Sequence, residues 1–413
     1  MKKGYLSEYF EGVAAKRLSA VEADSARSNQ HEFNGVDGLK QILGEPNGKV
    51  NYDAKWLYFT DQDDEPIIDE SPLTWYDSRQ KAREERNVMR WEYRLYFKTT
   101  TVSLNATEGD LLVIAKIRNG GLLVIVAENE SSISRQIEWL FGLSELAHPG
   151  FSVRSELENE QDRIGFASRF ILESIGIIIE ESEENYLDEM LLKFDGKFPT
   201  TRIFSQYAQS TLKELDPRDE PDSVLMAWME REEILFRTLE RYLIADRLSK
   251  GFSISNGLDV DGFIGFSLSV QNRRKSRVGY ALENHLEAIF KSNEIKCTRT
   301  TMTENRSKPD FLFPGASEYH DRSFNATKLT MLGVKSTCKD RWRQVLAEAD
   351  RIDQKHLLTL EAAISKNQTD EMIYKKLQLV IPKSLHETYS TQQKYWLMDL
   401  TSFVNFVKEK QSL

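Results

Sequence analysis

An aspartate and a lysine, each at the end of an apolar run, are the residues of this chain best placed to do chemistry. Asp310 follows Lys308-Pro309 and opens the run Phe311-Leu312-Phe313, and Lys335 closes the run Met331-Leu332-Gly333-Val334. An aspartate at a strand end can bind a hard divalent cation, and a lysine on a neighbouring strand can lie beside the water or phosphate oxygen that the metal activates. The pattern therefore indicates a site for metal-dependent phosphodiester hydrolysis.

A second carboxylate is needed to complete such a site. The pattern matches the Pro-Asp, then (Asp/Glu)-x-Lys arrangement of a large nuclease superfamily, except that the position of the second acid, residue 333, is glycine. Over 339–351 apolar residues are mixed with charged ones, which predicts a helix there. On that helix Glu348 can project back towards Asp310 and Lys335. Asp310 and Glu348 would then bind Mg²⁺, and Lys335 would orient the water or help to deprotonate it.

Two basic clusters flank the predicted site. The first has no acid among its cations, namely Arg273, Arg274, Lys275 and Arg277, and opens a predicted helix. In the second, Lys339, Arg341 and Arg343 surround Asp340. The formal net charge of −10 argues against a surface that is basic overall. Affinity for phosphate depends on local patches, so a duplex could dock at these two clusters.

Glu283 and Glu287 lie four residues apart on the first of these predicted helices and share one side of it. One of them, Glu283 in preference, could face the metal site without binding the metal directly, in contact with the groups that do bind it. Both could equally be surface acids.

The chain before residue 150 is predicted to be a mostly β domain. Apolar runs at 111–117 and 122–127 flank a glycine turn and predict a β-hairpin. Two earlier runs, 55–59 and 94–98, are also typical of strands.

Two polar stretches in this domain are candidates for DNA contact. Residues 74–91 mix arginines with an asparagine and two tryptophans, which can hold phosphates and read base edges. A solvated loop explains these residues equally well. For the other stretch, 16–19, the residues alone favour a polar loop without function over a DNA contact.

The length of 413 residues predicts two or three domains. Residues 151–190 are helical in pattern and acidic, and we predict a linker there, followed by an α/β domain over 191–413. Helical spacing of apolar residues over 223–250 indicates a core or dimer-interface helix.

Composition excludes several other classes of protein. The two cysteines, Cys297 and Cys338, lack partners at metal-ligand spacing, which argues against a zinc site and a disulfide framework. No apolar run is long enough to span a bilayer, and the N-terminus lacks the apolar core of a signal peptide. We predict a cytoplasmic protein without a membrane partner.

Over about residues 195–390 the chain resembles the EcoRII-type restriction endonucleases. The resemblance rests on Asn272–Arg277, Lys308–Pro314, Tyr319–Asp321 and Lys335–Gln344. In that family a glutamate on the following helix replaces the second acid, so Gly333 is itself a family trait. The resemblance implies a multidomain protein with a C-terminal α/β restriction-endonuclease-like, PD-(D/E)XK, domain.

The resemblance also implies that the N-terminal domain is a β pseudobarrel that grips the major groove of DNA with two arms. Residues similar to one arm are Lys16, Arg17 and Ser19. Residues similar to the other are Tyr76, Ser78, Arg79, Arg86, Arg90 and Trp91. The spacing in both arms departs from that of the family.

The implied activity is that of a type II restriction endonuclease. It would hydrolyse double-stranded DNA with Mg²⁺ at a short palindromic site containing CC/GG and leave 5′-phosphate ends, while the N-terminal domain binds a further DNA copy. Lys339, Asp340 and Arg341 would read the G·C pairs, since Lys and Arg donate to guanine and Asp accepts from cytosine. Without the resemblance, a charged helix start explains these three residues better.

A palindromic site implies a homodimer, which we expect the catalytic halves to hold. The host would need a companion DNA methyltransferase that is not a bound subunit. Two alternatives stay open, a repair or mobile-element nuclease on the same core and a DNA-binding regulator with a decayed nuclease domain.

Overall fold

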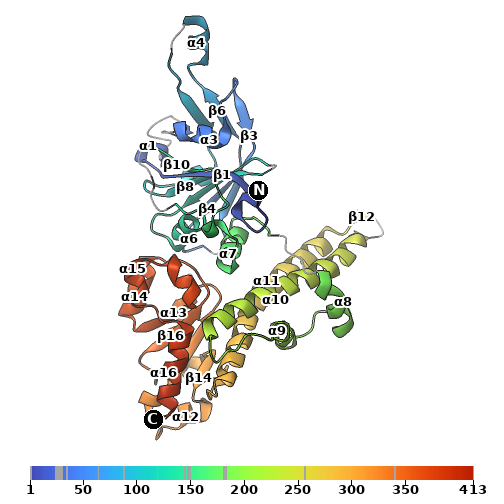
Figure 1. The fold of residues 1–413 in the computed structure, drawn as a ribbon, viewed down its shortest axis with the longest axis vertical. Helices are drawn as coiled ribbons and strands as arrows, with labels where there is room; N and C mark the ends of the chain where they lie inside the picture. The colour runs from blue at the N-terminus through green and yellow to red at the C-terminus, as the bar shows by residue number, and fades with distance from the viewer. Residues whose placement is uncertain are drawn as a thin grey trace. The chain divides into compact units, whose positions relative to one another are not determined.

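The computed structural model describes residues 2–23, 31–33, 36–63, 65–86, 89–118, 120–143, 146, 150–179, 184–254, 257–338 and 341–412. The chain folds as two compact units, Met1–Ile178 with Ala362–Gln368, and Ile179–Glu361 with Thr369–Leu413. Figure 1 colours both units by residue number. The division after Ile178 falls inside the segment 151–190, for which a linker was predicted.

The first unit contains a six-stranded sheet of order β10-β1-β8-β9-β4-β5. In that order the strands are Ser152–Arg154, Phe10–Arg17, Leu111–Ile117, Leu122–Ala127, Ala54–Phe59 and Ile67–Glu70. Strands β4 and β9 are parallel, and the other pairs are antiparallel. The predicted hairpin is present, with Leu111 of β8 opposite Ala127 of β9.

A four-stranded sheet of order β2-β7-β6-β3 completes the β structure of this unit. Its strands are Glu32–Phe33, Tyr93–Phe97, Leu73–Asp77 and Val50–Tyr52. Trp75 of this sheet and Trp56 of the larger one are buried in a common hydrophobic core. The first unit is thus mostly β, as predicted, and the pseudobarrel arrangement stays a prediction.

The segment 74–91, for which a solvated loop was one of two interpretations, contains regular structure. Strand β6 continues to Asp77, and helix α4 occupies Gln80–Arg86. Alternate residues of β6 point into the core, Leu73 and Trp75 among them, which is why a segment rich in polar residues still forms a strand.

Short helices cover the sheets of the first unit. They are η1 Leu6–Glu8, α1 Ala20–Ala23, η2 Val36–Leu39, α3 Lys40–Leu43, α5 Thr101–Asn105, α6 Ser132–Leu140, η3 Glu160–Asp162 and α7 Phe166–Ser174.

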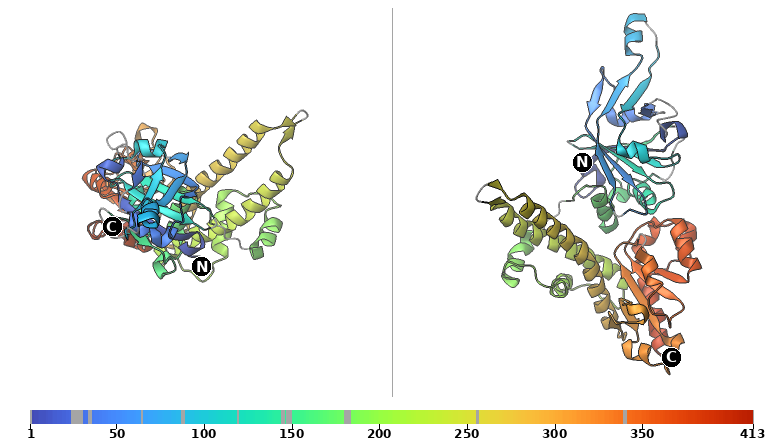
Figure 2. Two further views of the ribbon diagram at one scale, coloured as in Figure 1. Left: turned by 90° about the horizontal axis from the view of Figure 1, so that it is seen from above. Right: turned by 180° about the vertical axis from the view of Figure 1, so that it is seen from behind.

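The second unit begins with helices that culminate in a long antiparallel pair. These helices are α8 Glu184–Lys193, α9 Thr201–Ser210, α10 Pro221–Ser249 and α11 Val260–Ser292. Helices α10 and α11 run side by side (Figure 2) and are joined by the short ribbon of β11 Ser253–Ile254 and β12 Gly257–Leu258. Gly251 follows α10 with a φ of 68°, a conformation that glycine adopts without strain. The apolar pattern over 223–250 therefore marked a real helix.

Helix α11 starts well before the residue expected from the sequence. The Asp259 side chain accepts a hydrogen bond from Gly262 N at 2.9 Å and caps the helix there. The basic cluster at 273–277 consequently lies inside the helix and does not open it.

A five-stranded mixed sheet, of order β13-β14-β15-β16-β17, packs against the C-terminal part of α11. Its strands are Thr298–Arg299, Phe311–Phe313, Thr330–Lys335, Lys355–Thr359 and Leu377–Val380. The first three strands are antiparallel and the last three parallel. Phe290 of α11 meets Phe311 and Phe313 of β14 edge to face, with ring centroids 5.2 Å apart in both pairs.

The remaining helices of the second unit are short, apart from the last. They are η4 Glu304–Arg306, α12 Ala316–His320, η5 Ala326–Lys328, α13 Trp342–Val345, α14 Lys366–Tyr374, η7 Lys383–Thr388, α15 Thr391–Lys394 and α16 Leu400–Ser412. No helix in the described ranges is both long and apolar enough to cross a membrane.

Two predicted helices of this unit are shorter than expected. The helix over 339–351 is the single turn α13, and Ala349 already has a φ of 51°. The closing helix is interrupted between α15 and α16, because Met398 donates to Leu379 O at 3.1 Å and accepts from Ile381 N at 2.8 Å beside β17.

Candidate active site

Strand pairing brings Asp310 and Lys335 together. The register that pairs Phe311 with Leu332 sets Asp310, just before β14, beside the end of β15. One carboxylate oxygen of Asp310 accepts from Val334 N at 2.6 Å and from Lys335 Nζ at 3.2 Å. The other carboxylate oxygen has no hydrogen bond within the described residues and is available to a metal ion.

Glu348 supplies a second carboxylate from the turn after α13, and the expectation that it lies on the helix was wrong. Its side chain is buried, and Oε2 has no hydrogen-bond partner within the described residues. Burial raises the pKa of Glu348 to about 7, against an opposing effect of Lys335 and with a further rise from Asp310. Glu348 therefore lies within electrostatic range of both predicted partners.

Packing explains why residue 333 carries no acid. A Cβ atom on Gly333 would lie 2.8 and 3.0 Å from the two γ-carbons of Val345 in α13. Any side chain at 333 would collide with this valine, so the second carboxylate has to come from elsewhere. Glu348, three residues after Val345, is the carboxylate predicted for that role.

Glu283 of α11 lies at the edge of the same site. Burial raises its pKa, the Arg299 side chain lowers it by hydrogen bonding, and Asp310 raises it further. Arg299 donates to Glu283 at 2.6 Å, to Glu287 at 2.7 Å and to Asn284 Oδ1 at 3.0 Å. The sequence did not single out Arg299, because one arginine in a two-residue strand has no distinguishing pattern.

The carboxylates at this site suit Mg²⁺. Asp310 and Glu348 each present an oxygen without a protein hydrogen bond, and that of Glu348 is buried. Mg²⁺ is often bound by only one or two carboxylates, with water and phosphate oxygens completing its coordination. In the described part of the chain no three His, Cys, Asp or Glu side chains cluster as ligands. Two carboxylates are thus compatible with a bound Mg²⁺.

The basic cluster of α11 is largely used within the helices. Arg274 pairs with Glu240 of α10 at 2.7 Å. Arg277 is 4% exposed, pairs with Glu232 and Glu233, and stacks on Phe236. The cations left at the surface are Arg273, which lies over the ring of Phe198, and Lys275.

The second basic cluster follows β15. Lys339 and Asp340 lie outside the described residues. Arg341 is exposed, whereas Arg343 stacks on Trp342 and pairs with Glu371 at 2.7 Å.

The first candidate arm lies at the end of β1. Lys16 is 1% exposed and pairs with Glu22 at 2.7 Å, and Ser19 Oγ donates to the same glutamate at 2.7 Å. Arg17 is half-buried and pairs with Glu138. The structure does not present Lys16 at the surface, so a DNA contact by this residue would require the segment to rearrange.

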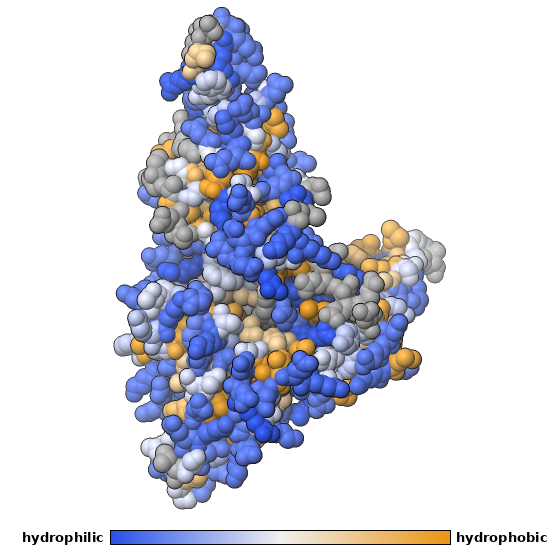
Figure 3. Space-filling view, in the orientation of Figure 1, coloured by the Kyte–Doolittle hydropathy of each residue, from blue (hydrophilic) through white to orange (hydrophobic). Residues whose placement is uncertain are grey.

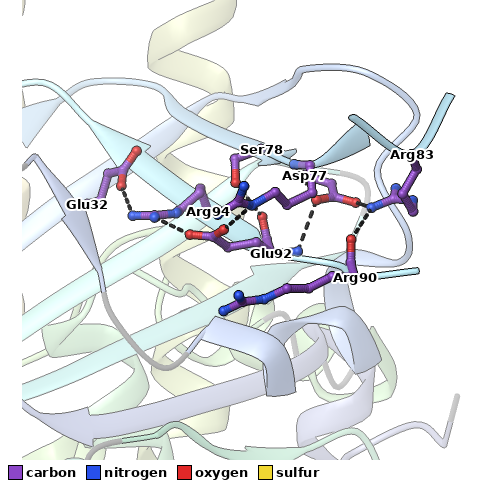
Figure 4. A network of polar contacts seen from close by, with 8 residues as sticks. Glu32, Asp77, Ser78, Arg83, Arg90, Glu92 and Arg94 are labelled. Carbon is purple, nitrogen blue, oxygen red and sulfur yellow. Dashed lines mark hydrogen bonds and ion pairs between the residues drawn. The ribbon is translucent and has the colours of Figure 1, made fainter. Parts of the chain in front are cut away.

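In and beside the second candidate arm, Arg79, Arg83 and Arg94 are paired with acids. Figure 4 shows Arg94 between Glu32 and Glu92, and Arg83 beside Asp77. Arg79 pairs with Glu92 at 2.7 Å, and Tyr76 donates to Glu32 at 2.7 Å, while Arg86 is the last residue of α4. Among the described residues of this arm, Arg90 and Trp91 have exposed side chains, the latter 50% exposed.

Comparison with known proteins shows what the second unit is similar to. Residues 236–404 match the family described as EcoRII C terminal. The type II restriction enzyme EcoRII of Escherichia coli is 40% identical over 232 residues, which are 55% of this chain and 55% of that protein. The resemblance inferred from the sequence is confirmed, and the chain spans about half the length of this curated relative.

Solved structures give weaker likenesses. Metal-depleted Ecl18kI in complex with uncleaved DNA has a TM-score of 0.45 and 16% identity, covering 55% of this chain and 84% of its own. A PspGI–substrate DNA complex has a TM-score of 0.44 and 14% identity, covering 52% of this chain and 94% of its own.

Proposed function

We propose that this protein is a type II restriction endonuclease that hydrolyses double-stranded DNA at specific sites with Mg²⁺. The observation that carries the proposal is the contact of Asp310 with Lys335 at 3.2 Å, with Glu348 within electrostatic range of both. These residues lie within a segment that matches the EcoRII C-terminal family.

Each residue has a role that follows from its position. Asp310 and Glu348 would hold the metal, which supplies a positive charge to neutralise the phosphoryl oxygens and acidify a bound water. Lys335, 3.2 Å from Asp310, would orient the attacking water and contact the scissile phosphate. Glu283 would support this arrangement from the edge of the site, with Arg299 fixing its orientation.

Sequence specificity belongs to the same proposal. We place recognition of a short palindrome containing CC/GG in Lys339, Asp340 and Arg341, directly after the catalytic strand. Cleavage would leave 5′-phosphate ends. The first unit would bind a further DNA copy through Arg90 and Trp91, whose side chains are exposed.

A homodimer would provide one active site for each strand of the palindrome. The antiparallel helices α10 and α11 offer a surface for it. Several of their apolar side chains are about half exposed or more, namely Tyr242, Leu248, Val260, Phe263, Ile264 and Leu268. Figure 3 shows apolar surface near the end of this helix pair. A companion methyltransferase in the host and a cytoplasmic location complete the proposal.

Digestion of a sequenced plasmid tests the activity. The full-length protein is incubated with Mg²⁺ or with EDTA, and the fragment ends are mapped. We expect discrete, Mg²⁺-dependent ends that share one short motif with G·C pairs. Asp310→Ala and Lys335→Ala should abolish cutting, whereas Lys375→Ala, at an exposed position on unit two, should cut like the wild type.

Two results would contradict the proposal. Undiminished cutting by the Asp310 or Lys335 variant would remove the site assignment. Intact DNA that nevertheless shifts on a gel would favour a DNA-binding regulator, and preference for a DNA structure over a sequence would favour a repair or mobile-element nuclease.

A further inference from the structure

A second concave site lies in the nuclease unit, away from the carboxylates. It is a cavity of about 720 Å³. Its lining includes Pro314, which follows β14, and Lys328, which precedes β15. Asp310 and Lys335 occupy the opposite ends of these same strands. Since β15 has six residues at roughly 3.3 Å each, the cavity lies roughly 17–20 Å from the catalytic residues.

The lining of this cavity is strongly basic. Its cations come from four separate segments and are Arg218, Lys296, Lys328, Lys408 and Lys410. The only acids in the lining within the described residues are Glu294 and Glu318, so five positive and two negative charges leave a balance of +3. This balance is opposite in sign to the net charge of −10 for the whole chain.

These cations are not neutralised by ion pairs. Within the described ranges none of the five lies in a salt bridge. Two of them bond to neutral oxygens, Lys408 to Asn293 Oδ1 at 2.8 Å and Lys410 to Leu329 O at 3.2 Å. Figure 1 shows the C-terminus, which follows these lysines, close to α12, where Glu318 lies.

The fold holds the two α16 lysines in place rather than leaving them to solvent. Asn293 is 4% exposed, and its Nδ2 donates to Pro217 O at 2.9 Å and to Ile289 O at 3.0 Å. Those two bonds fix Oδ1 as the acceptor that faces Lys408. Burial also lowers the pKa of Lys410, because the charged ammonium is partly removed from water. A bound anion would offset that cost.

From this geometry we propose that the cavity binds phosphate groups, supplied by a nucleic-acid backbone or by a free nucleotide. Lysines are compact point charges that suit phosphate oxygens without selecting a base. A volume of about 720 Å³ exceeds what a single phosphate needs and can accept several neighbouring ones. The occupant would be held while the catalytic end of the sheet stays free. The proposal does not depend on DNA cleavage by the protein.

Lys296 and Lys328 are the residues to change, because no hydrogen bond within the described residues depends on their ammonium groups. The test compares the full-length wild type with the double variant Lys296→Gln/Lys328→Gln. The matched control is Lys375→Gln/Lys383→Gln, which removes the same charge at exposed positions outside the cavity. Equal melting temperatures of the three proteins establish that folding is intact.

Two probes separate the possible sources of phosphate. Inorganic pyrophosphate is titrated calorimetrically in EDTA, so that no metal at the carboxylate site can bind it. A fluorescent 20-base-pair duplex without CC/GG is titrated over a range of KCl concentrations, also in EDTA. We expect the double variant to bind pyrophosphate about 10-fold more weakly than the wild type and the control.

The salt dependence of duplex binding then assigns the source. The slope of log K against log[KCl] is negative, and its magnitude grows with the number of phosphate contacts. If the cavity holds a DNA backbone, the slope should be shallower by about 1.8 in the double variant, about 0.9 for each lost phosphate contact. An unchanged slope with weakened pyrophosphate binding would assign the cavity to a free nucleotide. Wild type, control and double variant that behave alike with both probes would overturn the proposal. Plasmid cleavage is read separately, so failure of the proposed nuclease activity cannot be confused with this result.

Discussion

Neutralising the buried acid Glu348 should stabilise the metal-free protein at high pH. The variant is Glu348→Gln, which keeps the shape of the side chain and imitates its protonated form. In the folded protein the pKa of Glu348 is raised from an ordinary 4.5 to about 7 by burial. The folded state therefore binds the proton more tightly than the unfolded chain does, and this contribution to stability is complete below pH 4.5 and lost as the pH rises to about 7.

The size of the effect follows from the same two values. Each pH unit between them is worth about 1.4 kcal/mol, so ionising the buried carboxyl costs the folded protein about 3 kcal/mol. At pH 5 the wild type and the glutamine variant should have similar free energies of unfolding. At pH 8 the variant should be more stable by about 2–3 kcal/mol.

Urea unfolding in EDTA at the two pH values measures the difference. Glu409→Gln makes the same chemical change at an exposed position and should shift the free energy by less than about 0.5 kcal/mol at either pH. A Glu348→Gln difference that is the same at pH 5 and pH 8 would refute the reasoning, because it would mean that Glu348 titrates alike in the folded and unfolded states. The same variant should lose DNA cleavage, so stability and activity would move in opposite directions.

Further predictions concern packing and buried charges. Gly333→Ala should lower the free energy of unfolding by about 1–3 kcal/mol, because the new methyl group collides with Val345. The double variant Gly333→Ala/Val345→Ala should lose less stability than the sum of the two single variants, as measured by urea unfolding in a double-mutant cycle. Lys16→Met should lower the stability of the fold by about 3 kcal/mol, because it leaves the buried Glu22 without its ion-pair partner. The double variant Lys16→Met/Glu22→Leu should recover most of that loss in thermal melts. A single variant as stable as the wild type would instead agree with an exposed, DNA-binding Lys16. Arg299→Gln should cost on the order of 2 kcal/mol in the same melts, with a larger loss at pH 8 than at pH 5, because two partly buried glutamates lose their partner.

Strand ends and apolar runs were the features that the sequence could predict. The hairpin of β8 and β9 is nearly continuous apolar sequence because both of its strands are buried. Asp310 was recognisable because it precedes an apolar run, and Lys335 because it ends one. Antiparallel pairing of the two strands brings the start of the first next to the end of the second. Local pattern and tertiary contact agree at these positions.

Features that depend on how the chain folds back on itself could not be predicted. Lys16 lies near the end of strand β1 and resembles the start of a polar arm, yet Glu22 of α1 makes it half of a buried ion pair. Arg299 acquires its role only when β13 pairs with β14 near α11. The one-turn α13 ends at Val345, four residues before Ala349 takes a positive φ, and no residue pattern in the segment predicts that early end.

The contact between Gly333 and Val345 has a consequence for how such an active site can diverge. Moving the second carboxylate from residue 348 to residue 333 requires at least two changes, a smaller residue at 345 and an acid at 333. An acid introduced alone would disrupt packing before it could bind a metal, and removal of Glu348 alone would leave one carboxylate. If Glu348 holds the metal as proposed, neither change alone would give a site with two metal-binding carboxylates. Relatives of this chain that keep a bulky residue at 345 are therefore expected to keep the carboxylate at residue 348.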